Sequence, residues 1–301
     1  YKDLHDAHAY DPVADRWRAL APFGQPTEGL CSVWTGEEFF ILGCGPMRGK
    51  TLSWRYHPGR DKWTPLSDEG APETRRHAAA LFNGTEVWLT GGSGTAMKTF
   101  AAAYDPRTNK WRSLLKKGSP THRYWHEAVW TGTEALIIGG SRAGSNRVTD
   151  AYSFSESGKW RLINGQDMPG GRFFHTAAWT GKELLYWGGS DGSIHGDGAH
   201  YDPATGLWTP MELNGAPEKR AWHAWAWNGD RLLIWGGANF AHGLDDGFTY
   251  DPIKRQWESM SAKGAPSSRS KTISAWTGKE FIVWGGSRSI ELYNDGACWS
   301  P

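Results

Sequence analysis

Short apolar runs, most of them ending at a glycine pair, recur along the chain between polar turns. Leu184–Trp187 and Leu232–Trp235 are two such runs, and each stops at Gly-Gly. Apolar runs of this length, bounded by glycine and proline, are typical of strands, and the sequence shows no convincing helical spacing of apolar residues. The pattern therefore predicts an all-β protein.

Two sequence motifs repeat roughly every 48 residues, a spacing typical of repeat proteins. The first is Trp-Thr-Gly or a variant of it, an apolar run and Gly-Gly. The second is a tyrosine, usually followed by Asp-Pro, and then a tryptophan. Copies of the second motif are Tyr10…Trp17, Tyr56…Trp63, Tyr104…Trp111, Tyr152…Trp160, Tyr201…Trp208, Tyr250…Trp257 and a degenerate Tyr293…Trp299.

Each repeat is predicted to hold four short strands, named A to D. Strand A runs into the Thr-Gly or Asn-Gly turn, which suits a tight hairpin because these residues accept positive φ. Strand B ends at Gly-Gly. Strand C ends at Tyr-Asp-Pro, since proline has no N–H for the ladder, and strand D carries the tryptophan. This count gives six A/B pairs but seven C/D pairs, so one C/D pair is surplus.

These motifs resemble kelch repeats, and their residues are similar to those of Trp-rich bacterial kelch proteins. The resemblance covers nearly the whole chain. It implies a single six-bladed kelch β-propeller with four antiparallel strands per blade and a ring closed by the termini; seven blades is the alternative. Blades are then expected at about 27–66, 75–114, 123–163, 172–211, 220–260 and 269–301, with residues 1–20 as an extra strand pair involved in ring closure.

Charge and composition exclude several partners. Lys+Arg number 33 against 32 Asp+Glu, a net charge of +1, which gives no reason to expect nucleic acid. No apolar stretch approaches the roughly 18–20 residues of a membrane helix, so membrane insertion is not expected. The chain begins at Tyr1 without an initiator Met or a signal peptide, and we expect it to have been processed or truncated. A secreted, periplasmic or cell-surface location is favoured over a cytoplasmic one.

An arginine stands nine residues before the turn glycine in five repeats. Five guanidinium groups around one axis would form an anion-binding site, because each offers two parallel N–H donors. The alternative is structural, with each arginine bonding carbonyl groups or a neighbouring acid. The column and the aromatic residues beside it, which we predict as ligand-binding, are Arg75, Arg123, Tyr124, Arg172, Phe173, Arg220, Trp222 and Arg269. A histidine column, His126, His175 and His223, is interpreted as structural.

The loops between strands B and C supply the remaining candidates, since function concentrates in loops on a rigid scaffold. His195, His242 and Asp245 are predicted to contact the ligand. One alternative is that they form a metal site or an acid–base pair, and another is that they are solvated loop residues. Cys31 and Cys44 are interpreted as a free thiol pair, with a disulfide or a soft-metal site for copper as alternatives. No cofactor is predicted.

Three functions fit these features. The first, which we adopt, is a non-catalytic binding module whose funnel face takes an acidic peptide, protein or glycan. The second is an enzyme on an anionic sugar, similar to the sialic acid mutarotases among kelch proteins, or a metal- or copper-dependent kelch enzyme; no catalytic residue can be matched. The third is a purely structural propeller of a larger surface or secreted protein. Fold alone does not choose among them.

Overall fold

The computed structural model of this chain describes residues 7–22, 29–44, 52–94, 97–114, 117–144 and 148–301. The chain forms two compact units. Unit 1 is Tyr1–Glu134 with Phe154–Arg161, and unit 2 is Ala135–Ser153 with Leu162–Pro301. Residues 1–6, and residue 27 at the predicted start of the first blade, lie outside the described residues.

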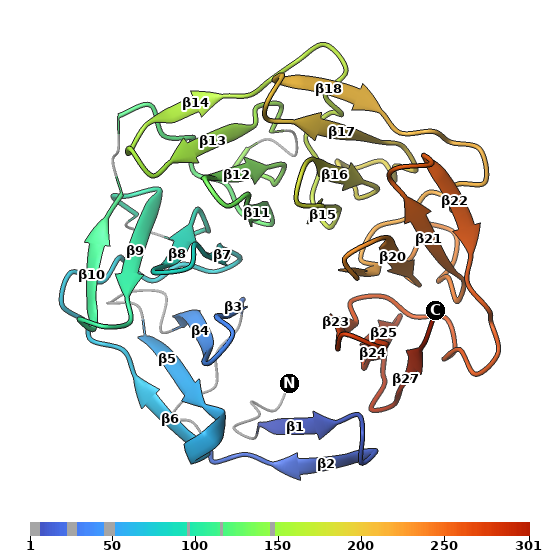
Figure 1. The fold of residues 1–301 in the computed structure, drawn as a ribbon, viewed down its shortest axis with the longest axis horizontal. Helices are drawn as coiled ribbons and strands as arrows, with labels where there is room; N and C mark the ends of the chain where they lie inside the picture. Colours follow the sequence, from blue (N-terminus) through green and yellow to red (C-terminus); the bar gives the residue numbers. More distant parts are fainter. Residues whose placement is uncertain (1–6, 23–28, 45–51, 95–96, 115–116, 145–147) are drawn as a thin grey trace. The chain divides into compact units, whose positions relative to one another are not determined.

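The predicted fold class is confirmed, because the described residues are all-β apart from one 3₁₀ turn at Pro58–Arg60. Five sheets have four antiparallel strands in chain order from one edge to the other (Figure 1). The first two sheets, in unit 1, are β3 (Cys31–Trp34), β4 (Phe39–Cys44), β5 (Leu52–His57) and β6 (Lys62–Pro65), then β7 (Ala79–Phe82), β8 (Val87–Thr90), β9 (Ala101–Asp105) and β10 (Lys110–Ser113).

The third sheet is the one through which the boundary between the units runs. Its strands are β11 (Glu127–Trp130), β12 (Glu134–Ile138), β13 (Tyr152–Ser155) and β14 (Trp160–Leu162). The next two sheets lie within unit 2. Their strands are β15 (Thr176–Trp179), β16 (Leu184–Trp187), β17 (Gly198–Asp202) and β18 (Leu207–Pro210), then β19 (Ala224–Trp227), β20 (Leu232–Trp235), β21 (Gly247–Asp251) and β22 (Gln256–Ser259).

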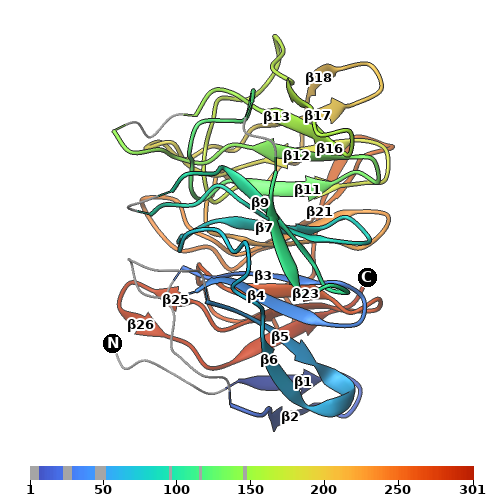
Figure 2. The same cartoon turned by 90° about the vertical axis from the view of Figure 1, so that its left-hand side faces the viewer.

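The sixth blade, also in unit 2, has three strands among the described residues: β23 (Ile273–Trp276), β24 (Phe281–Trp284) and β27 (Gly296–Trp299). A small hairpin of β25 (Ser287–Arg288) and β26 (Glu291–Leu292) stands between β24 and β27. In unit 1, β1 (His8–Asp11) and β2 (Arg16–Ala19) form a two-stranded sheet of their own. They lie beside β5 and β6 in both views (Figure 2), and Arg18 donates to the Tyr56 hydroxyl at 3.2 Å.

The predicted count of outer strands is wrong in one place. Trp299 pairs with Phe281, the first residue of β24, just as Tyr250 pairs with Leu232, the first residue of β20. Trp299 therefore takes the strand C position of the repeat tyrosine and not the strand D position of the repeat tryptophan. The described residues contain six C/D pairs, counting β1–β2, and one strand C, β27, without a strand D beside it.

Cross-strand pairing explains the spacing of the tyrosine and the tryptophan in the Tyr-Asp-Pro…Trp motif. Tyr201 faces Trp208 and Tyr250 faces Trp257 in the register of strands C and D, and the ring centroids are 4.9 Å and 4.8 Å apart. Aromatic pairs of this kind stabilise neighbouring strands. The aspartate closes the turn, because its carboxylate accepts backbone N–H groups two or three residues later, as Asp251 does from Ile253 and Lys254.

The glycine pairs join consecutive blades. The second glycine donates its N–H to the carbonyl of the arginine that opens the next blade, as Gly189 does to Arg220 at 2.9 Å. The first glycine lies against the histidine column, since a Cβ on Gly188 would stand 3.0 Å from the ring of His223. His223 in turn contacts the hydroxyl of Thr176 in the preceding blade at 2.8 Å. His126 contacts the Thr90 hydroxyl in the same way, at 2.9 Å. Neither ring nitrogen of His175 has a hydrogen-bond partner among the described residues, so the structural interpretation of the whole column stays a prediction.

Candidate functional site

The five arginines of the predicted site are buried, with no more than 2% of any side chain exposed. Each opens strand A of its blade, at the end of the sheet where strand B passes into the B–C loop. Arg220 illustrates the geometry. Its Nη1 donates to the Gly236 carbonyl at 3.0 Å and to Asp246 Oδ1 at 2.7 Å, and its Nη2 donates to Asp246 Oδ2 at 3.2 Å.

The same bidentate contact, in which one guanidinium group donates to both oxygens of a carboxylate, recurs in the three B–C loops of unit 2 whose residues are all described. Arg172 holds Asp197 and Arg269 holds Asp295, each aspartate being the last residue before strand C. The hydrogen bonds from Arg269 lower the pKa of Asp295, against a smaller opposing effect of burial. A buried guanidinium is thus neutralised by the loop of its own blade, and the contact fixes the end of that loop.

Arg75, in unit 1, has a different set of partners. Its Nη1 donates to the carbonyl groups of Gly91 and Phe100, at 3.2 and 3.1 Å. Burial lowers the pKa of Arg75 to about 10, partly offset by the charge of Glu73. Arg75, Arg172, Arg220 and Arg269 therefore make the carbonyl and carboxylate contacts of the structural alternative, within their own blades. Their predicted contact with a ligand stays a prediction.

A second column, two residues after the arginines, has an unusual backbone. Its members have φ between 56° and 59°, in the left-handed region where bulky side chains are rare. They are His77 and Trp125 in unit 1 and Phe174, Trp222 and Lys271 in unit 2. Trp222 was predicted as a site residue from its place in the repeat. Its backbone conformation was not predictable, because neither tryptophan nor phenylalanine favours positive φ.

Backbone hydrogen bonds run through this column from blade to blade. In unit 2, Trp222 N–H donates to the Phe174 carbonyl at 3.3 Å, and Lys271 N–H donates to the Trp222 carbonyl at 2.9 Å. The rings of Phe174 and Trp222 lie 5.1 Å apart. Phe173 stands edge-on to Phe174 at 5.0 Å, so this predicted residue joins the same cluster. We call Phe173, Phe174, Trp222 and Lys271 the aromatic face.

The aromatic side chains of this face are half-buried, and Lys271 is exposed. Unit 1 has a related group, in which His77 lies 5.2 Å from Trp125 and the predicted Tyr124 lies 4.8 Å from Trp125. Sequence reasoning missed Phe174 and Lys271 as site residues. Their alignment with Trp222 in the repeat was the available signal.

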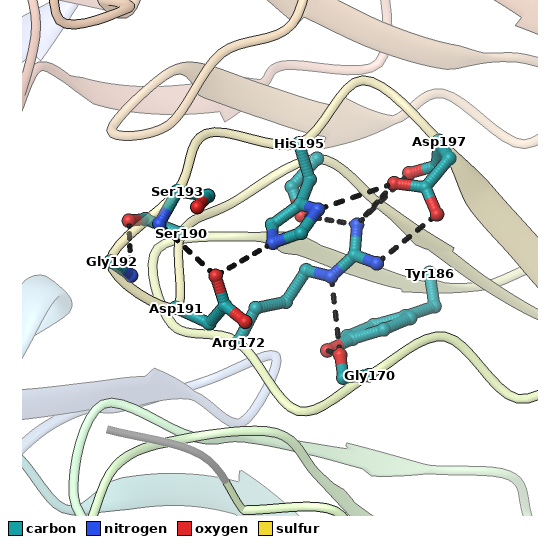
Figure 3. A network of polar contacts seen from close by, with 10 residues as sticks. Gly170, Arg172, Tyr186, Ser190, Asp191, Gly192, Ser193, His195 and Asp197 are labelled. Carbon is teal, nitrogen blue, oxygen red and sulfur yellow. Dashed lines mark hydrogen bonds and ion pairs between the residues drawn. The ribbon is translucent and has the colours of Figure 1, made fainter. Parts of the chain in front are cut away.

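His195 belongs to a polar network in the loop before β17, shown in Figure 3. Its Nε2 lies 2.9 Å from Asp191 Oδ1, and its Nδ1 lies 3.7 Å from Asp197 Oδ1, the carboxylate held by Arg172. His195 is thus enclosed by acids of its own loop. Asp191 and Asp197 were not predicted as partners, because the loop conformation that brings them to the ring is not encoded by a recognisable motif.

His242 and Asp245 lie in the next loop and are both exposed. The Nε2 of His242 faces Glu218 Oε2 at 3.5 Å. Each histidine is therefore placed against an acid near its own loop, His195 against Asp191 and His242 against Glu218. Within the described residues, no three His, Cys, Asp or Glu side chains are arranged to hold a metal ion.

Cys31 faces Leu42 in the register of β3 and β4, and its thiol lies 3.7 Å from the Leu42 carbonyl oxygen. The Cys44 side chain lies outside the described residues, so the predicted relationship between Cys31 and Cys44 stays a prediction. Among the helices of the described residues, none has the length and apolar character needed to cross a membrane.

The chain was compared with known families and proteins. The family profile described as the KLHDC2/KLHL20/DRC7 Kelch-repeats domain matches residues 77–286, more than two thirds of the chain. No curated protein matches the chain. The matched region contains four of the arginines, the left-handed column and the loops with His195 and His242. With blades of four antiparallel strands and the recurring Gly-Gly and Tyr…Trp pairs, this match shows that the chain belongs to the kelch-repeat family.

Proposed function

We propose that this protein is a non-catalytic protein-interaction module, and that a polypeptide ligand binds to the aromatic face of unit 2. The kelch-repeat family membership supports an interaction role. Phe173 is bridged to Ser190, and Ala221, next to Trp222, is bridged to Ala238. We expect the loops that follow, residues 190–197 and 239–246, to supply polar contacts. Loops on a rigid scaffold are common binding elements.

The observation that carries the proposal is the left-handed conformation of Phe174 and Trp222, with φ of 59° and 57°. A bulky residue in this region costs of order 1–3 kcal/mol, and such residues cluster at binding and active sites. Here the hydrogen bonds between consecutive blades impose the conformation. The rings are consequently fixed before a ligand arrives, which reduces the entropy lost on binding, and aromatic side chains commonly dominate interface energetics.

The acidic preference of the ligand is a finer part of the proposal. Because Arg172, Arg220 and Arg269 are each paired with an aspartate, they do not provide free positive charge. We therefore assign the acidic preference to the exposed ammonium group of Lys271. The predicted glycan ligand and the predicted enzymatic and purely structural alternatives stay predictions, because no contact of the described residues at the aromatic face favours any of them.

A peptide selection tests the proposal. A random peptide library displayed on phage is selected on the wild-type protein, and the Kd of the enriched peptides is measured by calorimetry. We expect Trp222→Asn to weaken binding by at least tenfold, since asparagine tolerates positive φ but removes the ring. Lys271→Gln should weaken only the peptides that contain Asp or Glu.

Ile253→Asn is the matched control, because Ile253 is exposed on the turn between β21 and β22, at the opposite end of its sheet from the B–C loop. It should bind as the wild type does. Thermal unfolding of both variants checks that the fold is kept. The proposal is wrong if enriched peptides bind Trp222→Asn and the wild type with equal Kd, or if no peptide is enriched.

A further inference from the structure

A groove of about 350 Å³ lies between the first two blades of unit 1, at the end of their sheets where strand A turns into strand B. The strands A of these blades, β3 and β7, lie side by side. The walls of the groove are the two A–B turns and the turn between β9 and β10, and its residues are Thr35, Glu37, Glu38, Phe82, Gly84, Thr85, Pro106 and Arg107. Sites that hold small molecules measure about 300–1,000 Å³, so the groove has room for one.

The lining of the groove combines hydrogen-bond acceptors, donors and an aromatic wall. Glu37 is exposed and offers its carboxylate oxygens as acceptors, whereas Arg107, with 78% of its side chain exposed, offers N–H donors. The Thr85 hydroxyl donates to Asn83 Oδ1 at 3.1 Å, which leaves the Thr85 oxygen as an acceptor. The half-buried Phe82 supplies apolar surface beside these groups.

Glu38 is the buried acid of the groove, with 9% of the residue exposed. Its Oε1 lies 2.6 Å from Nε2 of His57, and its Oε2 lies 3.6 Å from Nη1 of Arg55. Oε1 nevertheless accepts no hydrogen bond from the described residues. Arg55 also donates to the Pro106 carbonyl at 3.4 Å, so it connects Glu38 to the opposite wall. The Glu38 carboxylate therefore keeps acceptor capacity for a hydroxyl group.

Side-chain hydrogen bonds fix the three turns around the groove. Asn83 Oδ1 accepts the Thr85 N–H at 2.9 Å, and Asp105 Oδ1 accepts the Arg107 N–H at 2.8 Å. The hydroxyl oxygen of Thr35 closes the turn of the first blade by accepting a backbone N–H at 3.1 Å. Turns of this kind hold the backbone in one conformation. The lining is therefore largely in place before a ligand arrives, which lowers the entropy lost on binding.

The arrangement of charges decides the class of ligand. A small anion would meet Glu37 and Glu38, and a small cation would meet Arg107, with Arg55 behind Glu38; like charges placed together are unfavourable. A neutral molecule with several hydroxyl groups avoids both conflicts, because each hydroxyl can donate to the carboxylates and accept from the guanidinium. The Phe82 ring suits the apolar C–H surface of such a molecule.

We propose that this groove is a binding site for a neutral sugar. It differs in place and in charge from the acidic glycan ligand that the sequence predicts for the funnel face. It is also separate from the aromatic face, which belongs to unit 2 and to the end of its sheets where strand A begins.

The repeat supplies matched control positions in unit 2. Lys182 and Ile253 hold the places in the repeat that Glu37 and Arg107 hold in unit 1. All four residues are exposed on turns. Leucine at each of these positions removes a polar group from the groove in unit 1 and leaves the groove untouched in unit 2.

Saturation-transfer NMR titration of the 301-residue chain with D-glucose, D-galactose, D-mannose and N-acetyl-D-glucosamine measures the affinity. We expect a millimolar Kd for at least one of these sugars. The uronic acid and the 2-amino sugar that correspond to the tightest binder should bind at least fivefold more weakly. Glu37→Leu and Arg107→Leu should each weaken binding of the neutral sugar at least fivefold, whereas Lys182→Leu and Ile253→Leu should bind it as the wild type does.

Trp222→Asn, the variant that tests the peptide site, should also keep the wild-type affinity for the sugar, so the two proposals can fail separately. Thermal unfolding of every variant checks that the fold is kept. The sugar site is overturned if none of the four sugars binds or if the charged counterparts bind equally well. Wild-type affinity in both Glu37→Leu and Arg107→Leu also overturns it, because the sugar then binds elsewhere on the chain.

Discussion

At the residue scale, the glycine pairs are set by contacts with the following blade as well as by their own turn. Gly139 has φ of 67°, and a Cβ there would contact the Arg172 carbonyl oxygen and stand 2.6 Å from Cε1 of His175. Gly144 also has positive φ, 79°, but nothing lies within 4 Å of its Cβ position. The two glycines therefore separate the cost of backbone strain from the cost of crowding.

We predict that Gly139→Ala lowers the free energy of unfolding by about 2–5 kcal/mol, the sum of left-handed strain and overpacking. Gly144→Ala should lower it by about 1–2 kcal/mol, from strain alone. Urea unfolding followed by tryptophan fluorescence measures both values. Equal losses in the two variants would contradict the role given to the contact with Arg172 and His175.

At the element scale, each arginine of unit 2 ties the opening of strand A to the end of the B–C loop of its blade. Arg220 reaches Gly236 at the end of β20 and Asp246 just before β21, so the intervening loop is fastened at both ends. Arg231, which is half-buried, forms an ion pair with the exposed Glu258 on the same blade. It is a natural comparison for the buried arginine.

We predict that Arg220→Met lowers the free energy of unfolding by about 3–5 kcal/mol, because Asp246 and the Gly236 carbonyl lose their donor. Arg231→Met should cost only about 1 kcal/mol, because Glu258 is 53% exposed and solvent screens the pair. Denaturant titration gives both numbers. Hydrogen exchange should also be faster in residues 239–246 of Arg220→Met. A loss confined to peptide binding, with stability unchanged, would instead favour the ligand-binding role of the arginine.

At the scale of the whole molecule, buried histidines make stability depend on pH. Burial, aided by the charge of Arg172, lowers the pKa of His175 to about 3. Burial and the charges of Arg220 and His175 lower the pKa of His223 to about 3. Above an unfolded pKa of about 6.5 the histidines are neutral in both states. Between that value and about 3 only the unfolded chain takes up protons, so stability falls as the pH falls.

We predict that each of these histidines removes about 2 kcal/mol from the free energy of unfolding between pH 7 and pH 5. His223→Gln, which keeps a polar group near Thr176, should reduce the difference between the two pH values by that amount. Chemical denaturation at pH 7 and pH 5 provides the comparison. Ile253→Gln, which removes no titratable group, should retain the wild-type pH dependence. An unchanged pH dependence in His223→Gln would show that His223 takes up its proton over the same pH range in the folded protein as in the unfolded chain.

The local elements of this chain could be read from its sequence. Turn chemistry and strand patterning are local, so the hairpin at Thr180-Gly181 and the pairing of Tyr250 with Trp257 follow from residues within a few positions of each other. The repeat then extends each assignment to the other blades. This extension failed at Trp299, because the strand to which this tryptophan belongs is decided by its pairing with Phe281 and not by its residue type.

The site depended on the tertiary structure. The arginine column was visible in the sequence, but the partner of Arg220 is Asp246, 26 residues away at the end of a loop of irregular conformation. The positive φ of Trp222 is imposed by hydrogen bonds from neighbouring blades, against the preference of the residue itself. The sequence by itself determined the strands, the turns and the repeat, because these rest on short-range propensities. Which charges are neutralised and which rings are presented were decided by packing between segments far apart in the chain.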